Sequence, residues 1–186
     1  VYDLYCGTGT IGIYLAQRVK HVYGIEIIED AIKDAKINAE INNINNIDFY
    51  CGDLKDILDS DSMNEIAKPT VVIVDPPRPG LHPNTVKNLV RLSPEKIIYV
   101  SCNPSTQARD SKILQSNGYD LSKLTLVDMF PHTPHIETVG VLHHMEKPEK
   151  GLKILLNQLV DGRYIKNGLY SKIATKKIAD LRQNFS

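Results

Sequence analysis

Short apolar runs alternate with longer amphipathic stretches along most of this chain, and this alternation restricts the fold more than any other feature. Parallel strands need a long crossover connection, usually a helix, so the alternation predicts an α/β domain with a mostly parallel sheet. The strand-like runs are residues 1–5, 21–27, 47–51, 71–75, 96–101, 124–130 and 139–143. The helix-like stretches are residues 10–19, 29–43, 54–67, 83–92 and 104–117. No helix-length segment separates the last two runs, so we expect them to pair antiparallel at the sheet edge.

The chain is long enough for one full-sized domain, which we assign to residues 1–146. It opens on Val1 inside a strand-like run, and we therefore expect a fragment of a longer protein whose N-terminal part is missing. Residues 147–186 carry nine Lys and Arg against three Asp and Glu, whereas the domain has a net charge of −6. Leucines at helical spacing in this tail predict a basic, helical C-terminal extension.

The cysteines and the apolar runs bear on where the protein works. Cys6, Cys51 and Cys102 are far apart and form no CxxC pair, which argues against a disulfide framework or a cysteine metal site. This usage fits a reducing cytoplasm. No apolar run approaches the length of a membrane span. We therefore expect a cytoplasmic protein without a metal or a membrane partner.

A glycine-rich turn follows the first run, in the stretch Asp3-Leu-Tyr-Cys-Gly7-Thr-Gly9-Thr-Ile-Gly12. Glycines let the turn tighten and let the backbone approach a ligand at the start of a helix. Glu26 ends the second run, where a carboxylate can accept hydrogen bonds from ribose hydroxyls, and Asp53 follows the third. We expect Asp3, Gly7, Gly9, Glu26 and Asp53 to bind a nucleoside-containing cofactor, either NAD or S-adenosylmethionine; the acid at Asp3 favours the second.

The fourth run leads into Asp75-Pro-Pro-Arg78-Pro-Gly80. Two prolines lack N–H donors and stiffen the loop, so that Asp75 points outward to where a planar base could be held. Asp-Pro-Pro-Tyr at this place resembles the amino-methyltransferases that act on adenine or cytosine nitrogen. Arg78 stands where that class has its aromatic residue, which counts against it. We expect Asp75 and Arg78 to bind the substrate.

Two further motifs carry reactive side chains. The fifth run ends in Ser101-Cys102-Asn103-Pro104, and ligands of doubly wound sheets bind beyond the carboxyl ends of the strands, so Cys102 is a candidate nucleophile. Between the last two runs lies Phe130-Pro-His-Thr-Pro-His-Ile-Glu137. Its histidines stand in a proline-broken loop, not on one helical face, which disfavours a metal site. A general-base role for Glu137 is the better interpretation.

Together, DLYCGTGTIG, DPPRPGL, SCNP and VDMFPHTPHIE resemble the RNA 5-methyluridine methyltransferases, the uracil-C5 enzymes of tRNA and ribosomal RNA. The resemblance covers about three quarters of the chain. It implies a Rossmann-like class I methyltransferase fold with seven strands and helices on both faces, the cofactor S-adenosylmethionine and an RNA substrate. It implies that Cys102 is the nucleophile that attacks C6 of uracil and Glu137 the base that removes the C5 proton. It also implies that Tyr5, Thr10 and Asp75 lie around the cofactor and the target base.

The chain departs from this family in what it lacks. We expect the missing N-terminal part to hold the oligonucleotide-binding barrel and the cofactor-contacting glutamine that members of the family usually carry. Three scattered cysteines cannot supply the four-cysteine iron–sulfur cluster that many members have. Three alternatives stay open: an amino-methyltransferase for base nitrogen, an NAD-dependent oxidoreductase, and a non-catalytic cofactor-binding module.

Overall fold

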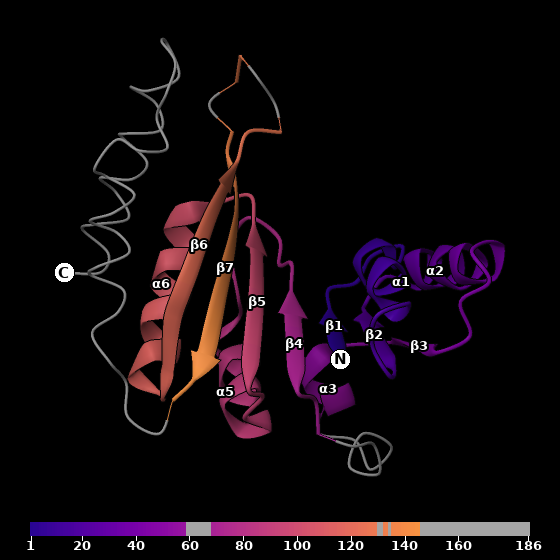
Figure 1. Ribbon diagram of the computed structural model, residues 1–186, viewed down its shortest axis with the longest axis horizontal. Helices are drawn as coiled ribbons and strands as arrows, with labels where there is room; N and C mark the ends of the chain where they lie inside the picture. The colour runs from indigo at the N-terminus through magenta and orange to yellow at the C-terminus, as the bar shows by residue number, and fades with distance from the viewer. Residues whose placement is uncertain (59–67, 130–131, 134, 146–186) are drawn as a thin grey trace. The chain divides into compact units, whose positions relative to one another are not determined.

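The computed structural model describes residues 1–58, 68–129, 132–133 and 135–145. Its strands form one seven-stranded sheet in the order β3-β2-β1-β4-β5-β7-β6, which is the α/β fold of class I methyltransferases expected from the sequence (Figure 1). The strands are β1 Tyr2–Leu4, β2 Val22–Glu26, β3 Ile47–Cys51, β4 Val71–Val74, β5 Lys96–Ser101, β6 Tyr119–Val127 and β7 Glu137–His144. The helices are α1 Thr10–Ala16, α2 Glu29–Ile41, α3 Leu54–Leu58, α5 Pro83–Leu92 and α6 Pro104–Ser116.

The main departure from the sequence expectation is the sixth strand. It begins at Tyr119, five residues before the expected start at 124. Tyr119 and Leu121 are buried and alternate with Asp120, but two polar residues, Ser122 and Lys123, follow together and break the strand pattern. A register irregularity between Leu121 and Lys123 also interrupts the alternation of side chains. The seventh strand likewise begins earlier than expected, at Glu137.

Two helical segments expected from the sequence lie partly or wholly outside the described residues. Of the helix expected over 54–67, the structure describes α3, which ends at Leu58. The expected extension over 147–186 lies wholly outside the described part of the chain.

The chain divides into two compact units, and each is described by itself. The first unit comprises Val1–Asp75 and Pro83–Ile97. Within it, β1 pairs in parallel with β2 on one side and with β4 on the other, as Leu4 opposite Ile25 and opposite Val74 illustrates. These three side chains are fully buried. Apolar burial at the centre of the parallel strands holds their carboxyl ends in register, which positions the loops that follow them.

Among the described residues, the second unit comprises Pro76–His82 and the chain from Ile98 to Met145. Here β6 and β7 pair antiparallel from Tyr119 opposite His144 to Val127 opposite Glu137, which confirms the expected antiparallel pair. Helix α6 packs against these two strands (Figure 1). Leu114 of α6 and Leu142 of β7 are fully buried in this unit.

Candidate active site

In the first unit, the glycine turn is held from within by a buried carboxylate. Asp3 is 1% exposed, and its Oδ2 accepts a hydrogen bond of 2.9 Å from the N–H of Gly12 in the first turn of α1. The helix begins after Gly9, which has a φ of 80° and no side chain to cap the free N–H groups. Asp3 of the neighbouring strand therefore supplies the cap that the turn itself lacks. A Cβ at position 12 would lie 2.9 Å from Asp3 Oδ2, so this contact requires glycine.

Burial governs the protonation of Asp3. Its pKa is raised to about 7 by burial, which outweighs the lowering effect of the Gly12 hydrogen bond, and the charge of Asp75 adds to the increase. Asp3 Oδ1 is buried and has no hydrogen-bond partner among the residues that the structure describes. Asp3 thus has little surface of its own and holds the glycine turn, and its part in cofactor binding stays a prediction.

We expect the Asp3→Asn protein to become increasingly more stable than the wild type as the pH rises. The folded-state pKa is above the ordinary 3.8, so the folded protein binds more protons than the unfolded chain between about pH 4 and 7. The wild type therefore loses stability as the pH rises through this window, by on the order of 4 kcal/mol, whereas the neutral asparagine does not titrate. Urea unfolding of both proteins at pH 4 to 8 measures the gap, which should widen with pH. Parallel curves would contradict this account.

Glu26, at the end of β2, lies against the same turn. Its Oε2 accepts a hydrogen bond of 3.1 Å from the N–H of Gly7, and its Oε1 accepts from the N–H groups of Ile27 and Ile28 at 2.8 and 3.1 Å. Gly7 has a φ of 51°, and apart from its chain neighbours no atom of the described residues lies within 4 Å of where its Cβ would be. A carboxylate has about four acceptor positions, so Glu26 can still accept from a ribose hydroxyl beside the open glycine backbone, and these residues fit a nucleoside cofactor.

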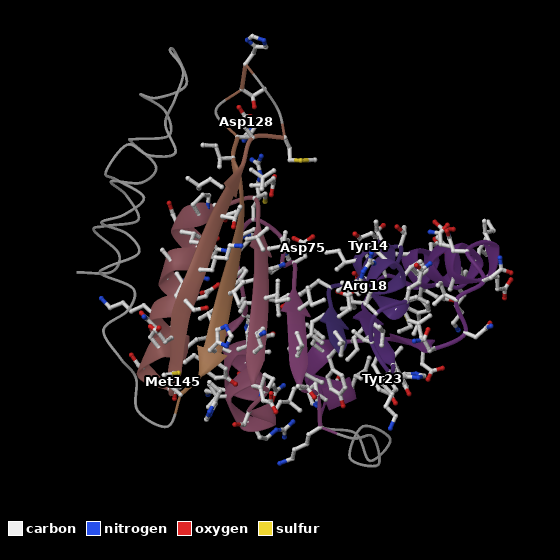
Figure 2. All side chains as sticks on the ribbon, in the orientation of Figure 1. Tyr14, Arg18, Tyr23, Asp75, Asp128 and Met145 are labelled. Atoms are coloured by element: carbon white, nitrogen blue, oxygen red, sulfur yellow. The ribbon has the colours of Figure 1, made fainter. Side chains whose placement is uncertain are left out.

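The other predicted cofactor residues of the first unit follow its strands. Tyr5 has a φ of 63°, and its hydroxyl lies 3.3 Å from Oγ1 of Thr85 on α5. Asp75 lies directly beyond β4, and its N–H bonds to the carbonyl of Leu4 (Figure 2). Thr10 and Asp53 are exposed, at the start of α1 and after β3. The carboxyl ends of β1 to β4 therefore bring the predicted cofactor residues to one edge of this unit.

In the second unit, the structure explains the sequence around Cys102. Ser101 Oγ donates to the carbonyl of Asn103 and accepts from its N–H, both at 3.0 Å. Asn103 is the N-cap of α6, where its side chain accepts from the N–H of Ser105, and Pro104 occupies the first turn. Strand end, cap and helix start thus follow within four residues. They leave the half-buried Cys102 in the sharp connection between β5 and α6.

Glu137 is brought to the same part of this unit by a long-range hydrogen bond. The buried Thr138 of β7 donates from Oγ1 to the carbonyl of Ser101 over 3.2 Å. Cys102 directly follows Ser101, and Glu137 directly precedes Thr138. The strand order, with β7 next to β5, makes this contact, and the half-buried Glu137 side chain begins β7.

The other cysteines lack these features. Cys6 is buried, and burial, followed by the charges of Asp3 and Glu26, raises its pKa to about 12, which disfavours a thiolate. Cys51 is exposed at the edge strand β3. Among the three, Cys102 has the position of a candidate nucleophile.

Arg78 belongs to the second unit and is held through its backbone. Its carbonyl accepts from Asn103 Nδ2 at 3.1 Å and Thr106 Oγ1 at 3.3 Å. Its guanidinium Nη2 lies 3.4 Å from Nδ1 of the exposed His135. Sequence reasoning missed Asn103 and Thr106 as supports of this loop. No local pattern could have shown this contact, since Arg78 lies 25 residues before Asn103 in the chain.

Residues 1–146 match the protein family described as tRNA (Uracil-5-)-methyltransferase. The chain belongs to this family. An uncharacterized RNA methyltransferase of Chlorobaculum tepidum is 48% identical over 147 residues, which cover 78% of this chain and 30% of the relative. One of Staphylococcus aureus is 48% identical over 143 residues, covering 77% and 31%. The chain thus spans about a third of the length of the relatives that it matches.

Solved structures agree with the family assignment. The tRNA (uracil-54, C5)-methyltransferase of Pyrococcus abyssi, solved with S-adenosyl-L-homocysteine, is 45% identical with a TM-score of 0.65. The match covers 76% of this chain and 33% of that one. The ribosomal protein L11 methylase of Lactobacillus delbrueckii subsp. bulgaricus is 12% identical with a TM-score of 0.58, a likeness of fold alone. No helix in the described part of the chain has the length and apolar character needed to cross a membrane.

Proposed function

We propose that the protein transfers a methyl group from S-adenosylmethionine to C5 of a uridine in RNA, and that residues 1–146 form its catalytic domain. The observation that carries the proposal is the Thr138–Ser101 hydrogen bond, which ties the strand that starts at Glu137 to the strand that ends beside Cys102. A thiol and a carboxylate at neighbouring strand ends meet the needs of uracil-C5 chemistry. Membership of the uracil-5-methyltransferase family supports the same reaction. The unpaired cysteines fit a cytoplasmic enzyme.

The first unit provides the cofactor residues. Glu26 accepts hydrogen bonds from the ribose hydroxyls, and the backbone of Gly7 and Gly9 approaches the cofactor. The other residues that line this edge of the unit are Tyr5, Thr10, Asp53 and Asp75. S-adenosylmethionine supplies an electrophilic methyl group on its sulfonium. The relative from Pyrococcus abyssi was solved with the demethylated product of this cofactor, which supports the assignment.

The second unit provides the reacting side chains. The target uridine leaves its base stack so that C6 is accessible. The Cys102 thiolate adds to C6; the S–C6 bond forms, and the electron pair of the C5–C6 double bond moves toward C5 and O4. C5 is then nucleophilic enough to accept the methyl group. Glu137 takes the C5 proton, the double bond returns, and the S–C6 bond breaks to release the thiolate. Arg78 of this unit binds the nucleotide during these steps, as does Asp75, the last residue of the first segment of the first unit.

The experiment that tests the function uses the intact protein, S-adenosylmethionine and RNA that contains 5-fluorouridine. Fluorine at C5 cannot leave as a cation, so the base step fails and the covalent adduct persists. We expect a protein–RNA adduct that mass spectrometry maps to Cys102. Total cellular tRNA and ribosomal RNA, each labelled with 5-fluorouridine, serve as separate substrates. Cofactor binding without an adduct on either RNA would refute the proposed chemistry.

A further inference from the structure

A buried carboxylate in the second unit, Asp110 of α6, joins three segments of the chain. It is 1% exposed. Its Oδ2 accepts from the N–H of Leu81 at 2.7 Å and from the hydroxyl of Tyr99 at 2.8 Å. Its Oδ1 pairs with Arg109, whose Nε and Nη2 lie at 2.8 and 2.7 Å. Both oxygens are therefore occupied by donors from the loop 76–82, from β5 and from α6 itself, as a buried charge requires.

The partners of Asp110 are themselves fixed. Tyr99 is fully buried in β5, and burial, followed by the charge of Asp110, raises its pKa, so its hydroxyl remains a donor. Arg109 Nη2 also donates to the carbonyl of Pro79 at 3.0 Å. The Asp110–Arg109 pair thus presents one acceptor and one donor to the same loop. The N–H of Leu81 donates to Asp110, and the carbonyl of Pro79 accepts from Arg109.

The loop approaches this pair as closely as its backbone permits. Gly80 has a φ of +81°, and a Cβ there would lie 2.6 Å from Asp110 Oδ2 and 2.8 Å from Arg109 Nη2. A side chain at position 80 would be strained by the backbone angle and would displace the pair. Glycine is therefore what lets the loop and α6 meet.

The same face of α6 holds Arg78. Asn103, Thr106 and Asp110 lie at helical spacing, and the first two donate to the Arg78 carbonyl. Asn103 directly follows Cys102. Helix α6 therefore begins two residues after the candidate nucleophile, and its side chains hold the loop that carries Arg78, the candidate substrate-binding arginine.

We propose that Asp110, with Arg109, is a positioning residue for RNA methylation: it holds the loop 76–82 so that Arg78 takes a fixed place relative to Cys102. This inference rests on the proposed function. Asp110 touches neither substrate nor cofactor and acts through the loop. Loss of the Asp110 carboxylate should therefore affect how RNA binds and reacts, while the predicted cofactor residues of the first unit keep their affinity for the cofactor.

The test compares Asp110→Asn with Leu114→Ala in the intact protein. Asparagine keeps the size of Asp110 but turns N–H groups toward Leu81, Tyr99 or Arg109, which are all donors. We expect kcat/KM for RNA to fall roughly 10- to 100-fold, because small misplacements of reacting groups cost that much. Affinity for S-adenosylhomocysteine should stay unchanged. Leu114→Ala opens a cavity further along α6, so it lowers stability without touching the loop.

A second variant approaches the same contact from the loop. Gly80→Ala should reproduce the loss in kcat/KM, since its Cβ would push against Asp110 and Arg109. All variants are assayed at a temperature at which circular dichroism shows them folded. Wild-type activity with RNA, and its adduct with 5-fluorouridine, tests the proposed function separately. The positioning role would be overturned if Asp110→Asn and Gly80→Ala both kept the wild-type kcat/KM for RNA. An equal loss of kcat/KM in Leu114→Ala would overturn it as well.

Discussion

Replacement of Cys102 by alanine is expected to abolish methylation of RNA, with a fall in kcat on the order of 10⁴-fold or more, the scale seen when a covalent nucleophile is removed. Without the thiolate, C5 of uracil has no source of the electron density that it needs to accept a methyl group. The measurement is transfer of a radiolabelled methyl group to RNA under single-turnover conditions. The adduct with 5-fluorouridine RNA should disappear as well.

Two controls make this result specific to the thiol of Cys102. Cys51→Ala removes an exposed thiol of the first unit and should leave the rate and the adduct unchanged. Binding of S-adenosylhomocysteine to Cys102→Ala should match the wild type, because the predicted cofactor residues belong to the first unit. A Cys102→Ala protein that still turns over would refute covalent catalysis and would favour an enzyme that methylates a base nitrogen.

Replacement of Glu137 by glutamine should separate the two halves of the reaction. The amide keeps the shape of the side chain at the start of β7 but cannot take the C5 proton, so the methylated base stays bonded to Cys102. Turnover should fall about 10²- to 10⁴-fold, the usual contribution of a general base. A covalent complex with ordinary, unfluorinated RNA should accumulate, visible as a slower band on a denaturing gel.

Asp128→Asn is the matched control for the carboxylate. Asp128 lies just beyond β6 and is exposed (Figure 2). The Asp128→Asn protein should methylate RNA at the wild-type rate and should accumulate no covalent complex with unfluorinated RNA. Trapping by Asp128→Asn in place of Glu137→Gln would reassign the base. Loss of both methylation and adduct in Glu137→Gln would mean that this carboxylate is needed before the proton leaves C5.

Local signals in the sequence predicted most of the fold. Helix α5 and the strands β3 and β5 begin and end where they were expected, because proline, glycine and capping residues mark their ends. The sixth strand begins earlier than predicted, because Ser122 and Lys123 together break the alternation of its first residues, which gain their burial from α6 and β7. The contact between the glycine turn and Glu26 follows from a similar local signal, because the turn and the acid at the next strand end obey a short spacing rule. That these residues bind the cofactor stays a prediction.

The sequence by itself determined the α/β fold, the glycine turn with Glu26, and the candidates Cys102 and Glu137, because each rests on a local pattern of residues. Only the tertiary structure decided how these residues are held. It brought Thr138 to the carbonyl of Ser101, 37 residues away, and Asp110 to Leu81, 29 residues away. Such contacts depend on strand order and on the packing of α6, so no spacing along the chain encodes them. Burial likewise gave Asp3 its raised pKa, since a carboxylate's ionisation follows from the water that surrounds it.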